Sequence, residues 1–308
     1  MTGGQLYIDG IDAYATWGIL IVQGGYKGMA TMPKLKSIDT NDWQEEDGIE
    51  ADLEAPVLDT RSFSISLGVL DVDFGIEAFL STVCNGAYHT WNFAEAGRTL
   101  KLRVTSFPDL DSLLSLGTFS VKVSDDFPLD GYDYLAPSSQ MGYANTGFKL
   151  DNVDLASYGI RVTQGTLDSF RKPSDIKENM LRNIDTVAGA IYDGKTVTKK
   201  SRTASIKCLM RAGSNAELWR NYDALLYNLS KPNERKLAVS ALGGTFPCYY
   251  SDMSVSEFVP VLSDGLPAWL EFTLKFTLTT GNAEYEEGLF TSEDGYALTT
   301  EDGYCIVI

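Results

Sequence analysis

The stretch WGILIVQG at residues 17–24 returns as YGIRVTQG at residues 158–165. The two copies lie 141 positions apart, and the same spacing keeps pairing identical residues further along the chain. These pairs are Lys36 with Lys177, Gly48 with Gly189, Asp52 with Asp193, Arg61 with Arg202, and Ser64 with Ser205. With one gap, Asp9 and Asp12 also meet Asp151 and Asp154. The sequence therefore predicts a tandem duplication of one folding unit.

The chain of 308 residues is long enough for two domains of about 150 residues, each with its own core. We expect a first unit at 1–124, a linker at 125–147, a second unit at 148–281 and a C-terminal β appendage at 282–308. The linker is rich in Pro, Gly, Asp and Ser and has no sustained period. The appendage repeats EDGY at 293–296 and 301–304, and each Asp-Gly is typical of a turn between short strands. We expect it to lie on a sheet edge, either of its own chain or of a neighbour.

Alternation of apolar and polar residues identifies the closing strand of each unit. WLEFTLKFTLT at 269–279 places Leu270, Phe272, Leu274, Phe276 and Leu278 on one side. TFSVKVS at 118–124 follows the same period of two, which is typical of a half-buried strand. We interpret the basic, partly apolar stretches at 99–107 and 235–242 as the corresponding strands before them.

A helix is expected between the strands of each unit. In the first, DFGIEAFLSTVCNG at 73–86 begins at a candidate cap, Asp73, and ends at Gly86. In the second, Ser214 and Glu217 form a capping-box pattern before an apolar stripe that ends at SKPN. Each unit then reads strand, long excursion, strand, helix, strand, strand. The predicted fold class is mainly β (α+β): two tandem β-barrel or sandwich units, each with one flanking helix.

The composition argues against several classes of function. The formal net charge is −17, from 25 basic and 42 acidic residues, so the chain should repel nucleic acid rather than bind it. It has one histidine and four cysteines without metal-site spacing, and we predict no metal and no cofactor. No apolar run is long enough to cross a membrane. The N-terminus shows no secretory signal, so we expect the protein to stay in the cytoplasm where it is made.

Three parts of the sequence resemble the N-terminal domain of phage distal tail proteins, which are relatives of the tail-tube fold. They are YIDGIDAYATWGILIVQGGY, the acidic excursion IDTNDWQEEDGIEADLEAP, and TRSFSISLGV followed by a helix. The resemblance covers residues 6–124 best and, through the repeat, 148–281 more weakly. It implies a β-barrel or folded sheet that assembles into a ring through strand pairing and a protruding hairpin. The chain departs from the usual distal tail pattern because it carries two tube-like units, as hub proteins of contractile tails do.

The resemblance implies that this chain is a structural protein of a virion tail, made in the bacterial cytoplasm and placed in the baseplate region between tube and tip. Its partners would be further copies of itself, as a hexamer or a pseudo-hexameric trimer, and other tail proteins. DNA would pass through the ring without specific binding. An acidic wall would suit such a passage, although the charge is equally explained by solubility.

The protruding hairpins would be residues 31–59 and 172–200, and their apolar residues are the candidate oligomer interface: Trp43, Ile49, Leu53, Ile184, Val187 and Ile191. The repeated aromatic-glycine pairs Trp17-Gly18 and Tyr158-Gly159 are candidate structural positions. We interpret them as packing at a bulge or bend in a strand.

Two other functions compete with the structural one. A carbohydrate-binding tandem β module would use exposed aromatics such as Tyr88 and Trp91. An enzyme is disfavoured, because His89 lacks a serine or cysteine motif and no nucleotide-binding or hydrolase motif is present. We therefore expect no catalytic residue.

Overall fold

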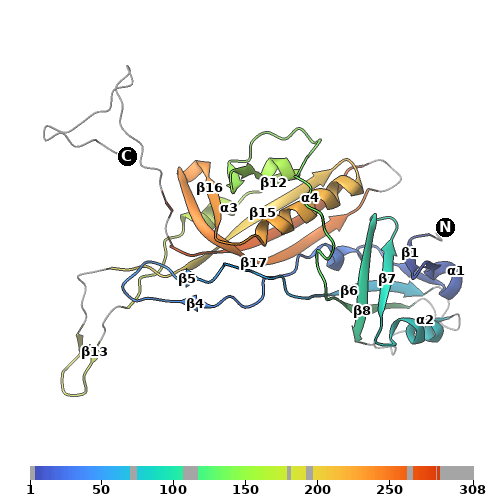
Figure 1. Ribbon diagram of the computed structural model, residues 1–308, viewed down its shortest axis with the longest axis horizontal. Coiled ribbons are helices and arrows are strands. Elements are labelled where there is room, and N and C mark those ends of the chain that lie inside the picture. The colour runs from blue at the N-terminus through green and yellow to red at the C-terminus, as the bar shows by residue number, and fades with distance from the viewer. Residues whose placement is uncertain are drawn as a thin grey trace.

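The computed structural model describes residues 4–69, 75–106, 117–178, 182–191, 197–261, 266–281 and 283–284. The structure is mostly β, with few helices, and its curled sheets form half-barrels (Figure 1). This confirms the predicted fold class. The EDGY repeats of the expected appendage and the candidate cap Asp73 lie outside the described residues.

The first seven-stranded sheet has the order β2-β1-β7-β8-β9-β6-β3. Its strands are β1 (Leu6–Ile8), β2 (Ile11–Asp12), β3 (Ile19–Ile21), β6 (Arg61–Val69), β7 (Tyr88–Phe93), β8 (Arg98–Ser106) and β9 (Thr118–Asp125). The pairings are antiparallel throughout. Two helices belong to this half, α1 (Ala13–Trp17) and α2 (Ile76–Val83), together with the 3-10 turn η1 (Lys27–Ala30).

The second seven-stranded sheet has the order β11-β10-β16-β17-β18-β15-β12. Its strands are β10 (Phe148–Leu150), β11 (Val153–Asp154), β12 (Ile160–Val162), β15 (Arg202–Ala212), β16 (Arg235–Val239), β17 (Gly244–Val259) and β18 (Ala268–Leu278). The helical segments are η2 (Leu155–Tyr158), α3 (Thr166–Arg171), α4 (Asn215–Leu229) and η3 (Ser240–Leu242). Replacing each strand with its counterpart in chain order converts one sheet into the other, so the two halves share one topology.

The repeated residues hold equivalent places in the two halves. Asp12 caps α1 and Asp154 caps η2 by accepting backbone N–H bonds. Gly18 and Gly159 follow these helices in the left-handed conformation, with φ of 66° and 73°. Trp17 and Tyr158 are buried, as packing positions should be, but they end short helices and do not lie at a bulge or bend in a strand, so that part of the interpretation is wrong. The glycines end short helices, because a left-handed C-terminal residue costs glycine least.

In both units an aspartate that follows the first strand bonds to a side chain of the neighbouring strand. Asp9 pairs with His89 at 2.6 Å, and its counterpart Asp151 pairs with Arg235 at 2.8 Å. The pKa of Asp9 is lowered: its partial burial would raise the pKa, but the bonds from His89 and from the Thr90 amide outweigh that effect. His89 itself is buried beside Asp9 and Asn85, so it fastens β7 to the β1–β2 turn.

Side-chain alternation in β18 is as predicted, with its apolar residues buried every second position. Ser214 caps the helix α4: its hydroxyl accepts the Glu217 amide at 3.1 Å, while the Glu217 carboxylate accepts the amide of Gly213. The helix α2 begins at Ile76, after Gly75. Both helices bury an apolar face, which for α2 consists of Ile76, Phe79 and Val83.

The correspondence of strands differs from the one predicted. Residues 99–107 and 235–242 are not equivalent, because β8 corresponds to β17, while β16 corresponds to β7. Each unit has three strands after its helix instead of two. The alternation rule misses β17 because Pro247 and two register shifts, between Tyr250 and Asp252 and between Val255 and Glu257, break its period of two.

The expected linker at 125–147 packs against the second unit. Along 126–147 it runs beside α4, where the Ser138 amide donates to Asn221 and the Gln140 amide donates to Glu217, both at 2.8 Å. Tyr134 packs on Tyr227 at 4.8 Å between ring centroids. These contacts attach the connection between the units to the outside of α4.

Candidate assembly site

In each unit the chain leaves the sheet between two strands and forms a long arm. We call residues 31–59 the first arm and residues 172–200 the second arm. Each arm closes with an isolated bridge, Leu35 with Leu58 and Ile176 with Lys199. Each also carries a short hairpin, β4 (Thr40–Asn41) with β5 (Glu50–Ala51), and β13 (Arg182–Asn183) with β14 (Ala190–Ile191).

The two arms differ in their surroundings. Figure 1 shows the first arm, in blue, running from the first unit beneath the sheet of the second, whereas β13 of the second arm projects beyond both sheets. The loop at 43–48, which we call the first tip, rests on the base of the second arm. The corresponding loop at 184–189, the second tip, leaves Ile184 and Val187 exposed at 40% and 48%.

Lys177 is the centre of this contact. Its ammonium group donates to the carbonyl oxygens of Trp43 at 2.7 Å, Glu46 at 2.8 Å and Gly48 at 2.6 Å. It also pairs with the carboxylate of Asp42 at 2.5 Å. The side chain is 2% exposed, and a buried ammonium is tolerated only when its three donors are satisfied. The first tip is thus wrapped around one lysine of the other unit.

Backbone bonds flank the lysine on both sides. The amide of Gly48 donates to the carbonyl of Lys199 at 2.7 Å, and the amide of Ile49 donates to the carbonyl of Thr279 at 2.8 Å. In the other direction, the Thr198 hydroxyl donates to the Gln44 carbonyl at 2.8 Å. Bonds of this kind fix the register of the first tip on the second unit.

Gly48 is required by this geometry. Its φ is +74°, and a Cβ atom at this position would lie 1.6 Å from the carbonyl oxygen of Thr279. A side chain is therefore excluded both by the backbone conformation and by the space.

A second contact joins the units at α4. The indole of Trp219 donates to the Ala96 carbonyl at 2.6 Å, and Asn215 donates to the Glu95 carbonyl at 2.6 Å. Arg98 stacks over Trp219 at 4.8 Å from its centroid and reaches Asp223 with two bonds, of 2.5 and 2.8 Å. Burial would lower the pKa of Arg98, but the pairing with Asp223 raises it above its usual value.

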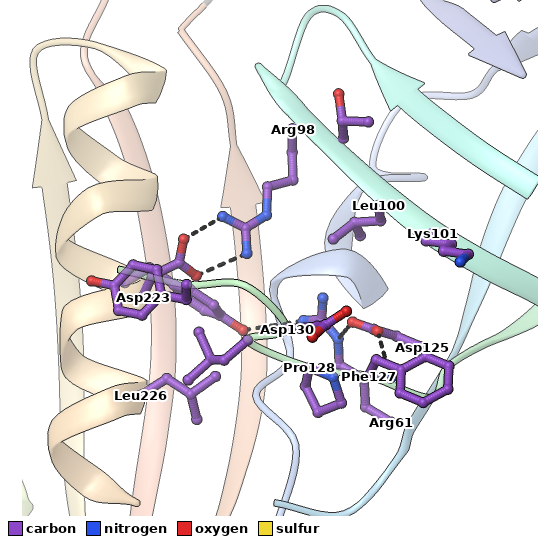
Figure 2. A pocket seen from close by; sticks show the side chains of 14 residues that line it. Arg61, Arg98, Leu100, Lys101, Asp125, Phe127, Pro128, Asp130, Asp223 and Leu226 are labelled. Carbon is purple, nitrogen blue, oxygen red and sulfur yellow. Dashed lines mark hydrogen bonds and ion pairs between the residues drawn. The ribbon is translucent and has the colours of Figure 1, made fainter. Parts of the chain in front are cut away.

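A cavity of about 290 Å³ lies at this junction, and Figure 2 shows Arg98 of β8 reaching Asp223 across it. Arg61 is bonded to Asp125 at 2.8 Å on the opposite wall. Burial raises the pKa of the Tyr222 hydroxyl to about 12, although the two arginines act in the opposite direction. Each of the two arginines is paired with an aspartate, so these ion pairs serve the junction between the units.

The sequence-predicted interface residues fall into two groups, one on each arm. Leu53 is buried at 4% and its carbonyl accepts the Asn233 amide, while Ile49 is half-buried beside Thr279. Trp43 is 52% exposed and contributes its carbonyl. These three lie against the second unit of their own chain. Ile184 and Val187 are exposed on the second tip, and Ile191 lies in β14.

The main receptor residues carry little signal in the sequence. Lys177 stands out only as the repeat partner of Lys36, and Thr198, Lys199 and Thr279 belong to no motif. The lysine that is repeated in two otherwise diverged arms is the one sequence signal that could have pointed to this receptor.

The carbohydrate hypothesis required Trp91 to be exposed, and this was wrong. Trp91 is 0% exposed in the core of the first unit, because it occupies an inward position of β7. Tyr88 is 38% exposed, but its hydroxyl is bonded to Asp126. Within the described residues, no group of three or more histidine, cysteine, aspartate or glutamate side chains is arranged to hold a metal ion. No described helix is long and apolar enough to span a membrane.

The fold and this site define a tandem β protein whose units are joined by an arm. No protein-family model matches the sequence, and no curated protein matches it. Among solved structures it is similar to the Dit protein (gp 19.1) of SPP1, which is described as a paradigm of the hub adsorption apparatus in phages that infect Gram-positive bacteria. The identity is 18% and the TM-score 0.34, over 48% of this chain and 55% of that one. The match thus spans about half the length of each protein.

Proposed function

We propose that the chain is a structural component of a phage or prophage tail, distal-tail-like or hub-like, that forms a ring joining the tail tube to the tail tip. Its function is mechanical, without catalysis or cofactor. The observation that carries the proposal is the contact between the two units, in which the tip of the first unit's arm binds around Lys177 of the second unit. A unit that carries both an arm and a receptor can be repeated around a closed ring.

Two further features support the proposal. The resemblance of residues 6–124 to distal tail proteins supplies the tail context. The net charge of −17 suits a channel that DNA crosses without being retained, because a polyanion finds few cationic groups to bind. Copies of this chain and other tail proteins are the proposed partners, and the virion tail is the proposed location.

Sedimentation velocity and negative-stain microscopy of the purified chain at micromolar concentration test the proposal. We expect a discrete oligomer of three or six chains with an open centre, since each chain contributes two units. A chain that sediments only as a monomer of 33.8 kDa, or as an open filament, would contradict it.

A further inference from the structure

We propose that the second tip binds a second copy of this chain, on a receptor of the first unit that no described residue of the same chain occupies. The inference rests on the proposed function, because it names the partner and the residues of the contact that would join chains. The receptor positions are the counterparts of those that hold the first tip: Lys36 for Lys177, Val57 for Thr198, Leu58 for Lys199 and Asp126 for Thr279.

The two tips have the same backbone shape. In the first, the Glu46 amide donates to the Trp43 carbonyl, and in the second the Val187 amide donates to the Ile184 carbonyl. Both turns end in a left-handed glycine, with φ of +74° at position 48 and +84° at position 189. The hairpins below them share one register, since the pair 41 and 50 corresponds to the pair 182 and 191. A receptor that binds the first tip should therefore also fit the second tip.

The two receptors also match. The Lys177 amide donates to the Thr198 carbonyl at 2.8 Å, and the Lys36 amide donates to the Val57 carbonyl at the same distance. In the sheets, Arg202 faces Leu278 and Arg61 faces Asp125. Thr279 and Asp126 are the next residues, so they occupy equivalent places at the ends of β18 and β9. The first unit thus presents the same framework around its own lysine.

Among the residues that the structure describes, only one of the two receptors is occupied. Lys177 is 2% exposed with four oxygen partners. Lys36 is exposed, and among the described residues its ammonium group has no hydrogen-bond or ion-pair partner. On the tip side, no described atom lies within 4 Å of a Cβ placed on Gly189, against 1.6 Å at Gly48. The second tip and the first unit's receptor therefore both have the shape of the occupied contact, and no described residue fills either of them.

The side chains suggest how the second contact differs from the first. Asn183 stands in place of Asp42, so Lys36 would meet an amide oxygen where Lys177 meets a carboxylate. Val57, 57% exposed, replaces Thr198, so the hydroxyl that Thr198 donates to the Gln44 carbonyl has no counterpart toward Asp185. The contact between chains is thus less ionic than the first and should depend less on salt.

The partner must be another molecule. In Figure 1 the second tip projects at the end of the molecule opposite to the strands of the first unit. The contact is also directional, since the arm of one unit meets the base of the next. Repeating it between chains gives a head-to-tail assembly, which closes into a ring or continues as a filament.

Two full-length variants test the docking by complementation. Lys36→Met removes the receptor and leaves the second arm intact, whereas Gly189→Val fills the space at the tip that Gly48 must leave empty. Each alone should weaken self-association at least about tenfold, because the tip carbonyls lose their donor or the tip loses its fit. Mixed one to one, they should form a heterodimer of about twice 33.8 kDa in sedimentation velocity, since one arm and one receptor remain compatible. Lys207→Met, at an exposed lysine of β15, should leave assembly unchanged.

Circular dichroism and thermal melting establish that both variants keep their fold. If oligomers persist unchanged in Lys36→Met and Gly189→Val, this docking is overturned while ring formation stands. Variants that fail to associate with each other when mixed also overturn it, because two damaged folds would give the same loss without complementation. A wild-type chain that never assembles overturns the docking and the proposed function together.

Discussion

Replacing Lys177 with methionine should release the first tip from the second unit. The free energy that holds the tip in place should fall by about 3 kcal/mol, as is typical when one partner of a buried charged group is removed. Methionine fills much of the space but leaves the carbonyls of Trp43, Glu46 and Gly48 without the donor that each has now. Hydrogen exchange of peptides covering 43–53 measures the effect, because the amides of Gly48 and Ile49 donate across the contact. Their exchange should accelerate roughly a hundredfold.

The repeat supplies the matched control. Lys36→Met makes the same change at the equivalent position of the first unit, where the side chain is exposed. In the dilute monomer it should alter unfolding free energy by less than about 0.5 kcal/mol, as surface substitutions usually do. Equal protection of 43–53 in the wild type and in Lys177→Met would show that Lys177 does not hold the tip.

Gly48→Ala should detach the first tip altogether. The substitution places a Cβ atom 1.6 Å from the Thr279 carbonyl oxygen, so the backbone of the tip must move and its bonds to Lys199 and Thr279 are lost. We expect the free energy of unfolding to fall by more than about 3 kcal/mol. Only about 1–2 kcal/mol of this loss is the ordinary strain of alanine at positive φ. Urea unfolding and cleavage by a glutamate-specific protease at Glu45, Glu46 or Glu50 of the first arm measure the two consequences, lower stability and an exposed arm.

Gly189→Ala separates strain from docking. The φ of this residue is +84°, so alanine suffers the same backbone strain, but no described atom lies near its Cβ position. The free energy of unfolding should fall by only about 1–2 kcal/mol. Protease cleavage in the first arm should not increase. If the two alanine variants lost equal stability, positive φ alone would explain both, and the close approach of Gly48 to Thr279 would have no energetic role.

The fold is predictable from the sequence where local chemistry decides it. Alternation marks β18, the Ser214 cap marks the start of α4, and a constant spacing of 141 positions marks the duplication. Prediction fails where local signals conflict. Pro247 and two bulges conceal β17, whose pairing with β16 and β18 outweighs its broken period. Gly18 suggests a strand bulge, although Asp12 caps a short helix just before it.

The candidate site is harder to predict. The sequence suggests that the arms bind neighbouring subunits, and residues such as Leu53 are candidates because they are apolar. The first contact instead lies within one chain and is made largely by backbone carbonyls around Lys177. Carbonyl groups carry no sequence signature, and no pattern distinguishes an arm that binds its own chain from one that binds another. We base that distinction on the comparison of Lys177, which has oxygen partners, with Lys36, which has none among the described residues.

The central claim is that the contact between the two units of one chain is repeated between chains. A cryo-electron microscopy map of the assembled full-length protein tests it most directly. At each junction between chains, the Lys36 ammonium group should lie about 3 Å from the carbonyl oxygens of residues 184, 187 and 189, as Lys177 lies against 43, 46 and 48. Chains joined through other surfaces, with Lys36 left in solvent and the second tip unbound, would contradict the account.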